Sequence, residues 1–225
     1  RQMQSAQLRG KKPSLEHESC FWERGYRAVA GLDEAGRGAW AGPVYAGAVI
    51  LAPQLPAPPQ LSAVRDSKQL SPAQREAAFA TIQATALAWA VGWASAVEID
   101  ALGIVPATRL AMTRALVALP FLPDALLIDA LRLPEIPLPQ QSFPFADALA
   151  LTVAAASIVA KVSRDRWMRE RAEVDFGGYG FAQHKGYGTR QHQAALAARG
   201  PCALHRRSFA PIATLGDKER GEVTR

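Results

Sequence analysis

The sequence has little cysteine and no long uncharged apolar segment. Its 225 residues include only two cysteines, Cys20 and Cys202, and no paired Cys or His spacing accompanies them, so neither a disulfide framework nor a zinc site is expected. The longest nearly uncharged apolar stretch, residues 148–160, is shorter than the roughly 20 residues that a membrane-spanning helix needs, and no signal-peptide pattern opens the chain. We therefore expect a soluble, cytoplasmic protein without a membrane partner, and a monomer by default.

The composition is that of a globular domain. Hydrophobic residues make up 49% of the chain and charged residues 20%, which excludes a disordered or fibrous protein. We expect one folded unit with appendages. The expected parts are a mobile leader at 1–13, a catalytic core at 14–175, a C-terminal loop and helical extension at 176–213 that contacts substrate, and a charged tail at 214–225.

Positive charge is concentrated in the last third of the sequence. The formal net charge is +6, and residues 161–225 hold 13 basic and 7 acidic residues, whereas residues 1–160 hold 13 of each. A basic sector of this kind attracts a polyanion, and nucleic acid is the usual one.

Periodicity and turn signals predict a mixed α/β fold. Ser71, Pro72 and Gln74 form a capping box with proline at the first helical position, so a helix begins there. Ser14 is expected to cap a shorter helix. Further helices are predicted over 99–119, 146–171 and 190–199, and strands over 28–33, 44–51, 87–97 and 124–130. This order favours a mixed sheet with helices on both faces and a helical C-terminal extension.

Four carboxylates stand where predicted strands end or where a long apolar helix begins: Asp33, Glu34, Asp129 and Asp147. None has a Lys or Arg within two residues in the sequence. The carboxyl ends of strands form the ligand crevice of open α/β sheets, and Asp33 and Asp129 lie at such ends. Grouped carboxylates raise each other's pKa unless cations neutralise them. The pattern favours Mg²⁺, which is held by a few carboxylates together with substrate phosphate.

Two such ions, about 3.5–4 Å apart, form a clamp for in-line displacement at phosphorus.

Simpler explanations of the same acids remain open. Asp147 opens a helix, where an acid is favourable without any metal. Asp33 and Glu34 are neighbours on a strand and reach one site only if the following turn breaks the alternation of faces. Asp129 could cap a turn.

Six segments of the sequence narrow the choice between a metal site and these simpler explanations of the acids. They are AGLDEAGRGAWAGPV (30–44), DSKQLS (66–71), LLIDA (126–130), DALALTVAAASIVAKVSRD (147–165), HKGYGT (184–189) and HRRSFAP (205–211). In this order and spacing they closely resemble bacterial ribonuclease HII, the type 2 ribonuclease H. The resemblance extends over nearly the whole chain.

The resemblance implies a ribonuclease H-like fold and a site with two divalent ions, Mg²⁺ or Mn²⁺. It also implies endonucleolytic cleavage of RNA in RNA/DNA hybrids, including single ribonucleotides embedded in duplex DNA. By the family's motifs, Asp33, Glu34, Asp129 and Asp147 are the metal-binding acids. The same likeness assigns Gly36, Arg37 and Gly38 to sensing the ribose 2′-hydroxyl, and Tyr187 to the junction between RNA and DNA. A 2′-hydroxyl is what distinguishes RNA from DNA, and glycines allow backbone groups to approach it closely.

Four basic residues are candidates for phosphate contact, which positions a duplex without reading its sequence. They are Lys68, Lys161, Arg164 and Lys185. The chain departs from the family pattern at Ala130 and Ala146, where glycine is usual. If either position requires a positive φ, alanine there costs on the order of 1–2 kcal/mol.

Three rival interpretations remain. A type 3 ribonuclease H is disfavoured because fewer than 30 residues precede the first predicted strand. A non-catalytic module that binds RNA/DNA hybrids would have little use for all four acids. A small-molecule phosphatase does not explain the basic C-terminal third. The C-terminus shows no convincing motif for a sliding-clamp partner.

Overall fold

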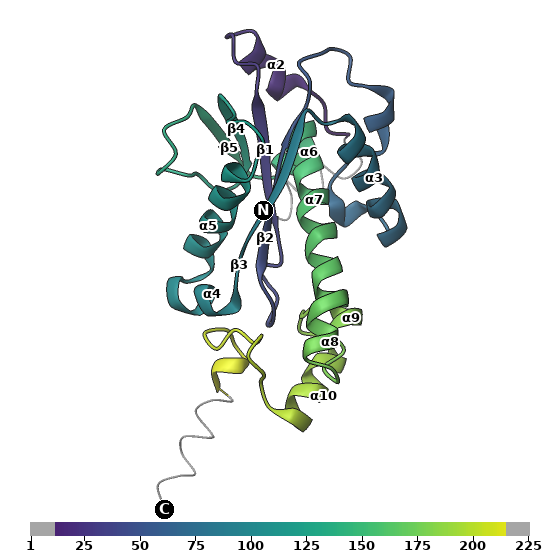
Figure 1. Ribbon diagram of the computed structural model, residues 1–225, viewed down its shortest axis with the longest axis vertical. Coiled ribbons are helices and arrows are strands. Elements are labelled where there is room, and N and C mark those ends of the chain that lie inside the picture. The colour runs from purple at the N-terminus through teal and green to yellow at the C-terminus, as the bar shows by residue number, and fades with distance from the viewer. Residues whose placement is uncertain (1–11, 215–225) are drawn as a thin grey trace, which may run out of the picture.

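The computed structural model describes residues 12–214, in which a five-stranded sheet is flanked by helices on both faces (Figure 1). Most of the predicted leader and tail, residues 1–11 and 215–225, lies outside the described residues. The strand order is β3-β2-β1-β4-β5. The strands are β1 Val29–Ala35, β2 Val44–Ile50, β3 Ala88–Ala94, β4 Ala125–Asp129 and β5 Gln140–Phe143.

The sheet is mixed, as predicted. β1 pairs antiparallel with β2, and β2 with β3, whereas β4 runs parallel to both β1 and β5. The fifth strand was not predicted from the sequence. Its four residues, QQSF, are mostly polar and only partly buried, so they lack the apolar alternation that signals a strand.

Two long helices cover the two faces of the sheet. α7 (Leu151–Trp167) packs on β1 and β2, with α3 (Pro72–Thr85) beside it, and α5 (Ile104–Val117) packs on the opposite face. The run of small residues in α7 lets the helix lie very close to the sheet. A Cβ on Gly31 would stand 2.2 Å from the carbonyl carbon of Thr152, and one on Gly47 would stand 2.4 Å from the carbonyl oxygen of Ala156. Glycine on the strands and alanine on the helix therefore set the spacing between these layers.

Two predicted helices are interrupted. Gly103, with φ +82, ends α4 (Ala96–Leu102) and precedes α5, so the predicted helix 99–119 is two helices. Ala150 adopts an extended conformation between α6 (Ala146–Leu149) and α7. The capping box of Ser71 is confirmed, but the cap predicted at Ser14 is wrong because Leu15 occupies the N-cap of α2 (Glu16–Trp22) without a side-chain bond.

The C-terminal extension packs against the end of α7 and the lower end of the sheet in Figure 1. It follows the π-helical η3 (Met168–Ala172) and α8 (Glu173–Asp175), and it contains α9 (Phe181–His184) and α10 (Arg190–Arg199). A third apolar cluster, which includes Met168, Phe181 and Ile212, holds it in place. Within residues 12–214, no helix is both long enough and apolar enough to cross a membrane.

Candidate active site

Three elements bring the predicted acids to one edge of the sheet. Leu32 of β1 pairs with Ile128 of β4 in parallel register, so Asp33 and Asp129, the next residues, lie side by side at the carboxyl ends of these strands. Asp129 Oδ1 accepts a hydrogen bond of 2.8 Å from the backbone N–H of Ala146. This bond ties the first residue of α6 to β4 and places Asp147 next to the strand acids.

The acids share one electrostatic environment. Asp33 is 3% exposed, and burial together with the charges of Glu34, Asp129 and Asp147 raises its pKa well above the usual value. Burial also raises the pKa of Asp129, with a further contribution from Glu34. The pKa of Asp147 rises to about 6, chiefly through burial. The carboxylates are therefore close enough to repel one another.

Glu34 joins this environment although β1 remains regular through Ala35, so the following turn does not break the alternation of faces. Its position near the strand end suffices for its charge to raise the pKa of both Asp33 and Asp129. Glu34 Oε1 pairs with Arg37 Nη1 at 3.1 Å, whereas its Oε2 is buried without a hydrogen-bond partner.

Lys68 supplies a cation that sequence spacing did not place beside the acids. Its Nζ lies 3.2 Å from Asp147 Oδ2 and 3.8 Å from Asp66 Oδ1. Most of the Lys68 side chain is exposed, so the loss of hydration that lowers its pKa is outweighed by the charges of Asp147, Asp33 and Asp66, which raise it. The loop position is fixed from both sides, since Asp66 accepts from the Lys68 N–H and Ser157 Oγ of α7 accepts from the Ser67 N–H. Asp66 is thus an additional acid of the site, one that was not predicted.

The donor set fits a hard divalent cation. Apart from the Lys68 ammonium the converging groups are carboxylates, their mutual repulsion calls for further positive charge, and Glu34 Oε2 is a buried oxygen without a partner. Within residues 12–214, no three Asp, Glu, His or Cys side chains already have the arrangement of a metal site. The acids of this cluster are the ones that would hold such a cation.

The Gly36–Gly38 turn follows β1 directly. Gly36 has φ +95, and a Cβ there would lie 2.0 Å from Arg164 Nε, so the fold itself requires glycine at this position. Gly38 differs, because its φ is ordinary and a Cβ there would meet nothing within 4 Å. Glycine at 38 is therefore not required by internal packing, which leaves space for a ligand close to the backbone.

Tyr187 and this turn both lie next to Arg164. Its partly buried ring has Lys161 Nζ at 5.5 Å and Arg164 Cζ at 5.4 Å from its centroid. Arg164 is fully buried, and its Nε donates to the carbonyl of Pro43. In this structure Arg164 therefore supports the backbone next to the turn and has no surface with which to contact phosphate, contrary to the role expected from the sequence.

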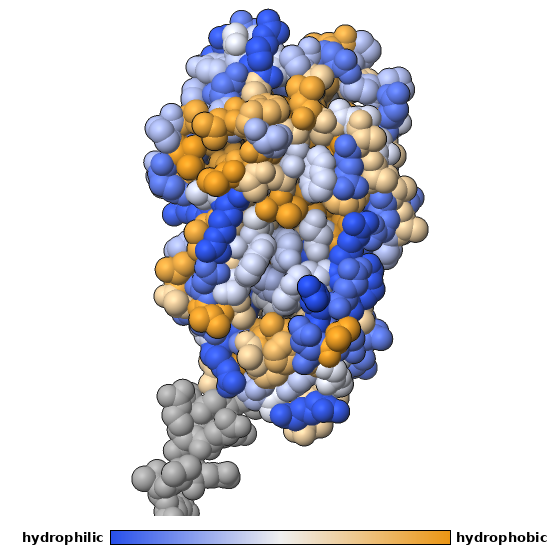
Figure 2. All heavy atoms as spheres, in the orientation of Figure 1, coloured by the Kyte–Doolittle hydropathy of each residue, from blue (hydrophilic) through white to orange (hydrophobic). Residues whose placement is uncertain are grey.

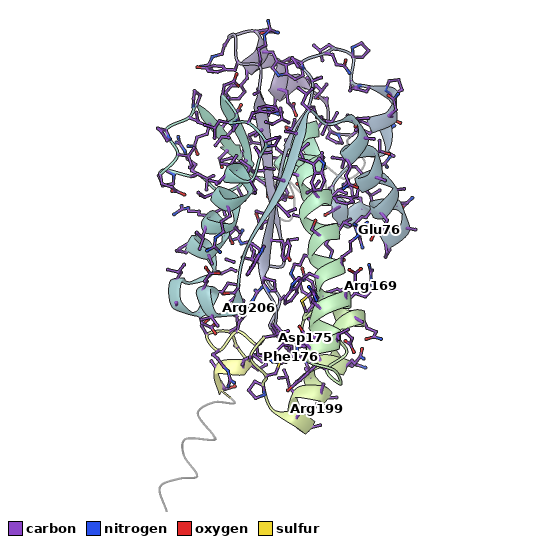
Figure 3. The ribbon with its side chains drawn as sticks, in the orientation of Figure 1. Glu76, Arg169, Asp175, Phe176, Arg199 and Arg206 are labelled. Atoms are coloured by element: carbon purple, nitrogen blue, oxygen red, sulfur yellow. The ribbon has the colours of Figure 1, made fainter. Side chains whose placement is uncertain are left out.

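Lys161 and Lys185 line a groove of about 310 Å³ between α3, the C-terminal half of α7 and α9, together with Tyr187, Arg75 and Arg169. Figure 2 shows hydrophilic residues gathered on this side of the molecule, where Figure 3 labels Glu76 and Arg169. Lys161 Nζ also pairs with Asp165 at 2.7 Å, and Lys185 Nζ donates to the carbonyl of Ala182. The groove is thus basic but partly neutralised by internal contacts.

Positive φ is required at only one of the two positions where alanine replaces the usual glycine. Ala130, directly after Asp129, has φ +55. Ala146 is helical, and the left-handed residue is its neighbour Phe145, with φ +62. Of the two alanines only Ala130 carries this strain, which costs on the order of 1–2 kcal/mol, and the non-glycine residue Phe145 carries strain of the same kind.

Comparisons with known proteins agree with this geometry. The family model described as Ribonuclease HII matches residues 30–212. Ribonuclease HII of Chloroflexus aggregans is 54% identical over 206 residues, which cover 91% of this chain and 97% of the relative. A ribonuclease HII of Thermus thermophilus is 55% identical over 196 residues, 87% of this chain and 92% of the relative.

A solved structure extends the likeness to three dimensions. Ribonuclease H2 from Pyrococcus horikoshii superposes with a TM-score of 0.70 at 27% identity, covering 85% of this chain and 98% of that one. The mixed sheet, the flanking helices and the helical C-terminal region are those of this fold. The chain therefore belongs to the ribonuclease HII family, whose members are nucleases that cut RNA in RNA/DNA hybrids.

Proposed function

We propose that this protein is an endoribonuclease that cuts the phosphodiester on the 5′ side of a ribonucleotide and leaves a 3′-hydroxyl and a 5′-phosphate. Its substrates are RNA/DNA hybrids and DNA duplexes that contain single ribonucleotides, as in replication and repair. The observation that carries this proposal is a group of four carboxylates close enough to raise one another's pKa, next to a turn with open space at Gly38. The four are Asp33, Glu34, Asp129 and Asp147.

The acids act by holding cations rather than by moving protons. When bound, two Mg²⁺ or Mn²⁺ ions would supply an activated water and would neutralise charge on the leaving oxygen. Asp33 and Asp129 are placed by adjacent strands, so the sheet itself sets their spacing. Lys68 adds a positive charge next to Asp147, where it also lies within reach of an incoming phosphate.

The Gly36–Gly38 turn and Tyr187 would recognise the ribose. Backbone groups of the turn can reach a 2′-hydroxyl because Gly38 leaves the approach open. The Tyr187 ring offers a flat surface for a sugar or base, with the cations of Lys161 and Arg164 near it. Lys161 and Lys185 in the adjoining groove would hold the backbone of the duplex.

A labelled DNA duplex with one ribonucleotide tests the proposal. We expect a single nick 5′ of the ribose with Mg²⁺ or Mn²⁺, and none with chelator. Asp33→Asn should abolish turnover while hybrid binding persists, whereas Asp175→Asn, at an exposed position, should cut like the wild type. Binding without any nicking by the wild type would instead identify a non-catalytic hybrid-binding module.

Gly38→Ala separates recognition from folding. The added methyl group meets no protein atom, so the free energy of unfolding should change by less than about 1 kcal/mol. The same methyl group would obstruct the ribose, so cleavage at an embedded ribonucleotide should fall at least about tenfold, a loss of about 1.4 kcal/mol in transition-state binding. Unchanged cleavage by a stably folded Gly38→Ala variant would remove the turn from the ribose site.

A further inference from the structure

The side chain of Arg206 donates hydrogen bonds to the backbone of the Gly36–Gly38 turn. It belongs to the C-terminal segment, lies near the lower end of the sheet (Figure 3) and has no exposed surface. Its Nη1 donates to the carbonyl of Arg37 at 2.8 Å, and its Nη2 donates to the carbonyls of Gly36 at 2.7 Å and Gly42 at 2.9 Å. Its Nε donates to the Gly42 carbonyl as well, at 3.0 Å. One planar guanidinium thus fixes three carbonyls of the loop that contains the turn.

The preceding residue, His205, is linked to the other half of the ribose site. The backbone N–H of Cys202 donates to His205 Nδ1 at 2.9 Å, so the proton of this neutral ring belongs on Nε2. His205 Nε2 lies 3.0 Å from His192 Nε2, and His192 Nδ1 lies 3.0 Å from the carbonyl of Tyr187. With protons assigned in this order, every contact joins one donor to one acceptor and the chain ends on the backbone of Tyr187.

Asp100, at the C-terminal end of α4, anchors the segment to the core. Its carboxylate accepts from the backbone N–H of Arg207 at 2.7 Å and of Ser208 at 2.9 Å, and from Ser208 Oγ at 2.6 Å. We call residues 205–208 the C-terminal clamp. It contacts the turn through Arg206 and is linked to the Tyr187 carbonyl through His205 and His192, while Asp100 holds it in place.

We infer that Arg206 is a positioning residue for ribose recognition, and that the C-terminal clamp holds the Gly36–Gly38 turn and Tyr187 in register with each other. This inference rests on the proposed role of the turn and Tyr187 in reading the 2′-hydroxyl. Arg206 itself does not touch substrate, because it is buried beneath the turn.

The guanidinium of Arg206 is better suited to fixing the position of backbone carbonyls than to filling space in the core. Burial and the nearby charge of Arg164 lower the pKa of Arg206 to about 9, so a cation is kept here at an energetic cost. An apolar side chain could fill the same space, but it could not bind three carbonyls. A lysine ammonium is a single point charge and lacks the planar fork that reaches all of them.

Arg206→Lys tests the inference, and Arg207→Lys is its matched control, since the Arg207 side chain is exposed and only its backbone N–H, which the substitution keeps, anchors the clamp. Both variants are first checked for thermal unfolding. Cleavage rates are then measured on a duplex with one embedded ribonucleotide. The ribose preference is the ratio of the affinities for that duplex and for the same duplex with deoxyribose throughout, both measured without divalent ion. Mn²⁺ affinity is measured separately, by titration of the protein alone.

We expect Arg206→Lys to lose about tenfold to a hundredfold in kcat/KM, as misplaced recognition groups do, and to lose preference for the ribose-containing duplex. Mn²⁺ affinity should stay within about threefold of the wild type, and Arg207→Lys should match the wild type throughout. A purely structural role would lower the folded fraction but leave the ribose preference of folded molecules unchanged. Equal ribose preference in folded Arg206→Lys and Arg207→Lys would overturn the inference.

If Arg206→Lys does not fold, the same measurements on Asp100→Ala test the inference. This substitution removes the hydrogen bonds that anchor the clamp to α4 and leaves Arg206 unchanged. A fall in ribose preference supports the inference, and unchanged preference refutes it. Failure of the proposed function looks different, since the wild type itself would then show no ribose-dependent nicking.

Discussion

Replacing Asp147 by Asn should stabilise the protein in the absence of metal. The pKa of this carboxyl rises from 3.8 to about 6 in the folded state, chiefly because the side chain is buried. A group whose folded pKa is raised contributes stability while it is protonated, and this contribution is lost as the pH rises through the folded pKa. At pH 7 the wild type therefore carries a buried charge whose cost Asn avoids.

The magnitude follows from the shift. About 2 pKa units correspond to about 3 kcal/mol at 1.36 kcal/mol per unit. The ion pair with Lys68 is already included in that pKa, and the Lys68 side chain is 77% exposed, so its loss adds little. We expect Asp147→Asn to raise the free energy of unfolding by about 2–3 kcal/mol at pH 7, and by only about 0.5 kcal/mol at pH 4.

Urea unfolding at several pH values in the presence of chelator measures this difference. Asp175→Asn, at an exposed carboxylate, should stay within about 0.5 kcal/mol of the wild type. Saturating Mn²⁺ should reverse the order, because only the wild type retains the full set of acids. An Asp147→Asn protein that is less stable than the wild type at pH 7 without metal would refute the reasoning that the buried Asp147 charge destabilises the folded protein.

Three other changes probe the framework around the site. Gly31→Ala places a methyl group against the backbone of Thr152, so it should cost at least about 1–3 kcal/mol in unfolding experiments and weaken Mn²⁺ binding. Glu18→Ala leaves the Thr152 N–H and hydroxyl without their shared acceptor and should cost about 2–4 kcal/mol, whereas Glu18→Gln should cost under about 1 kcal/mol by thermal unfolding. Burial lowers the pKa of His192 and of His205 to about 4, so protonation of each in the unfolded chain lowers the free energy of unfolding as the pH falls below about 6.5. Between pH 7 and 5, His205→Gln should therefore lose about 2 kcal/mol less of that free energy than the wild type in urea titrations.

The proximity of the two strand acids could be predicted from the sequence because their positions depend on strand ends. Asp33 and Asp129 each follow a buried apolar run, and parallel neighbours in a sheet bring such ends together. Asp147 could be placed near the start of a helix but not against β4, because its position depends on the bond from the Ala146 N–H to Asp129. The approach of Asp33 to Asp129 was therefore predictable from local pattern, and the approach of Asp147 to them was not.

The partners of the acids were beyond sequence reasoning. Lys68 and Asp66 lie far from Asp147 in the chain, and only the packing of the Ser67 loop on α7 brings them close. Arg206 stood in a recognised segment, HRRSFAP, but nothing in its neighbourhood distinguishes it from Arg207. Burial separates the two arginines, and burial is a property of the whole fold.

The spacing of the clustered acids is set by residues that carry no charge. Asp33 extends from β1, and Asp147 precedes α7, so the distance between them depends on how closely that helix approaches the sheet. Gly31 and Gly47 admit the backbone of α7 at a separation that any larger side chain would prevent. Repulsion among the acids acts to push these layers apart, whereas burial of the apolar side chains of α7 holds them together. The packed core therefore keeps the acids closer than their charges favour, and that enforced proximity is what would give the site its affinity for a divalent cation.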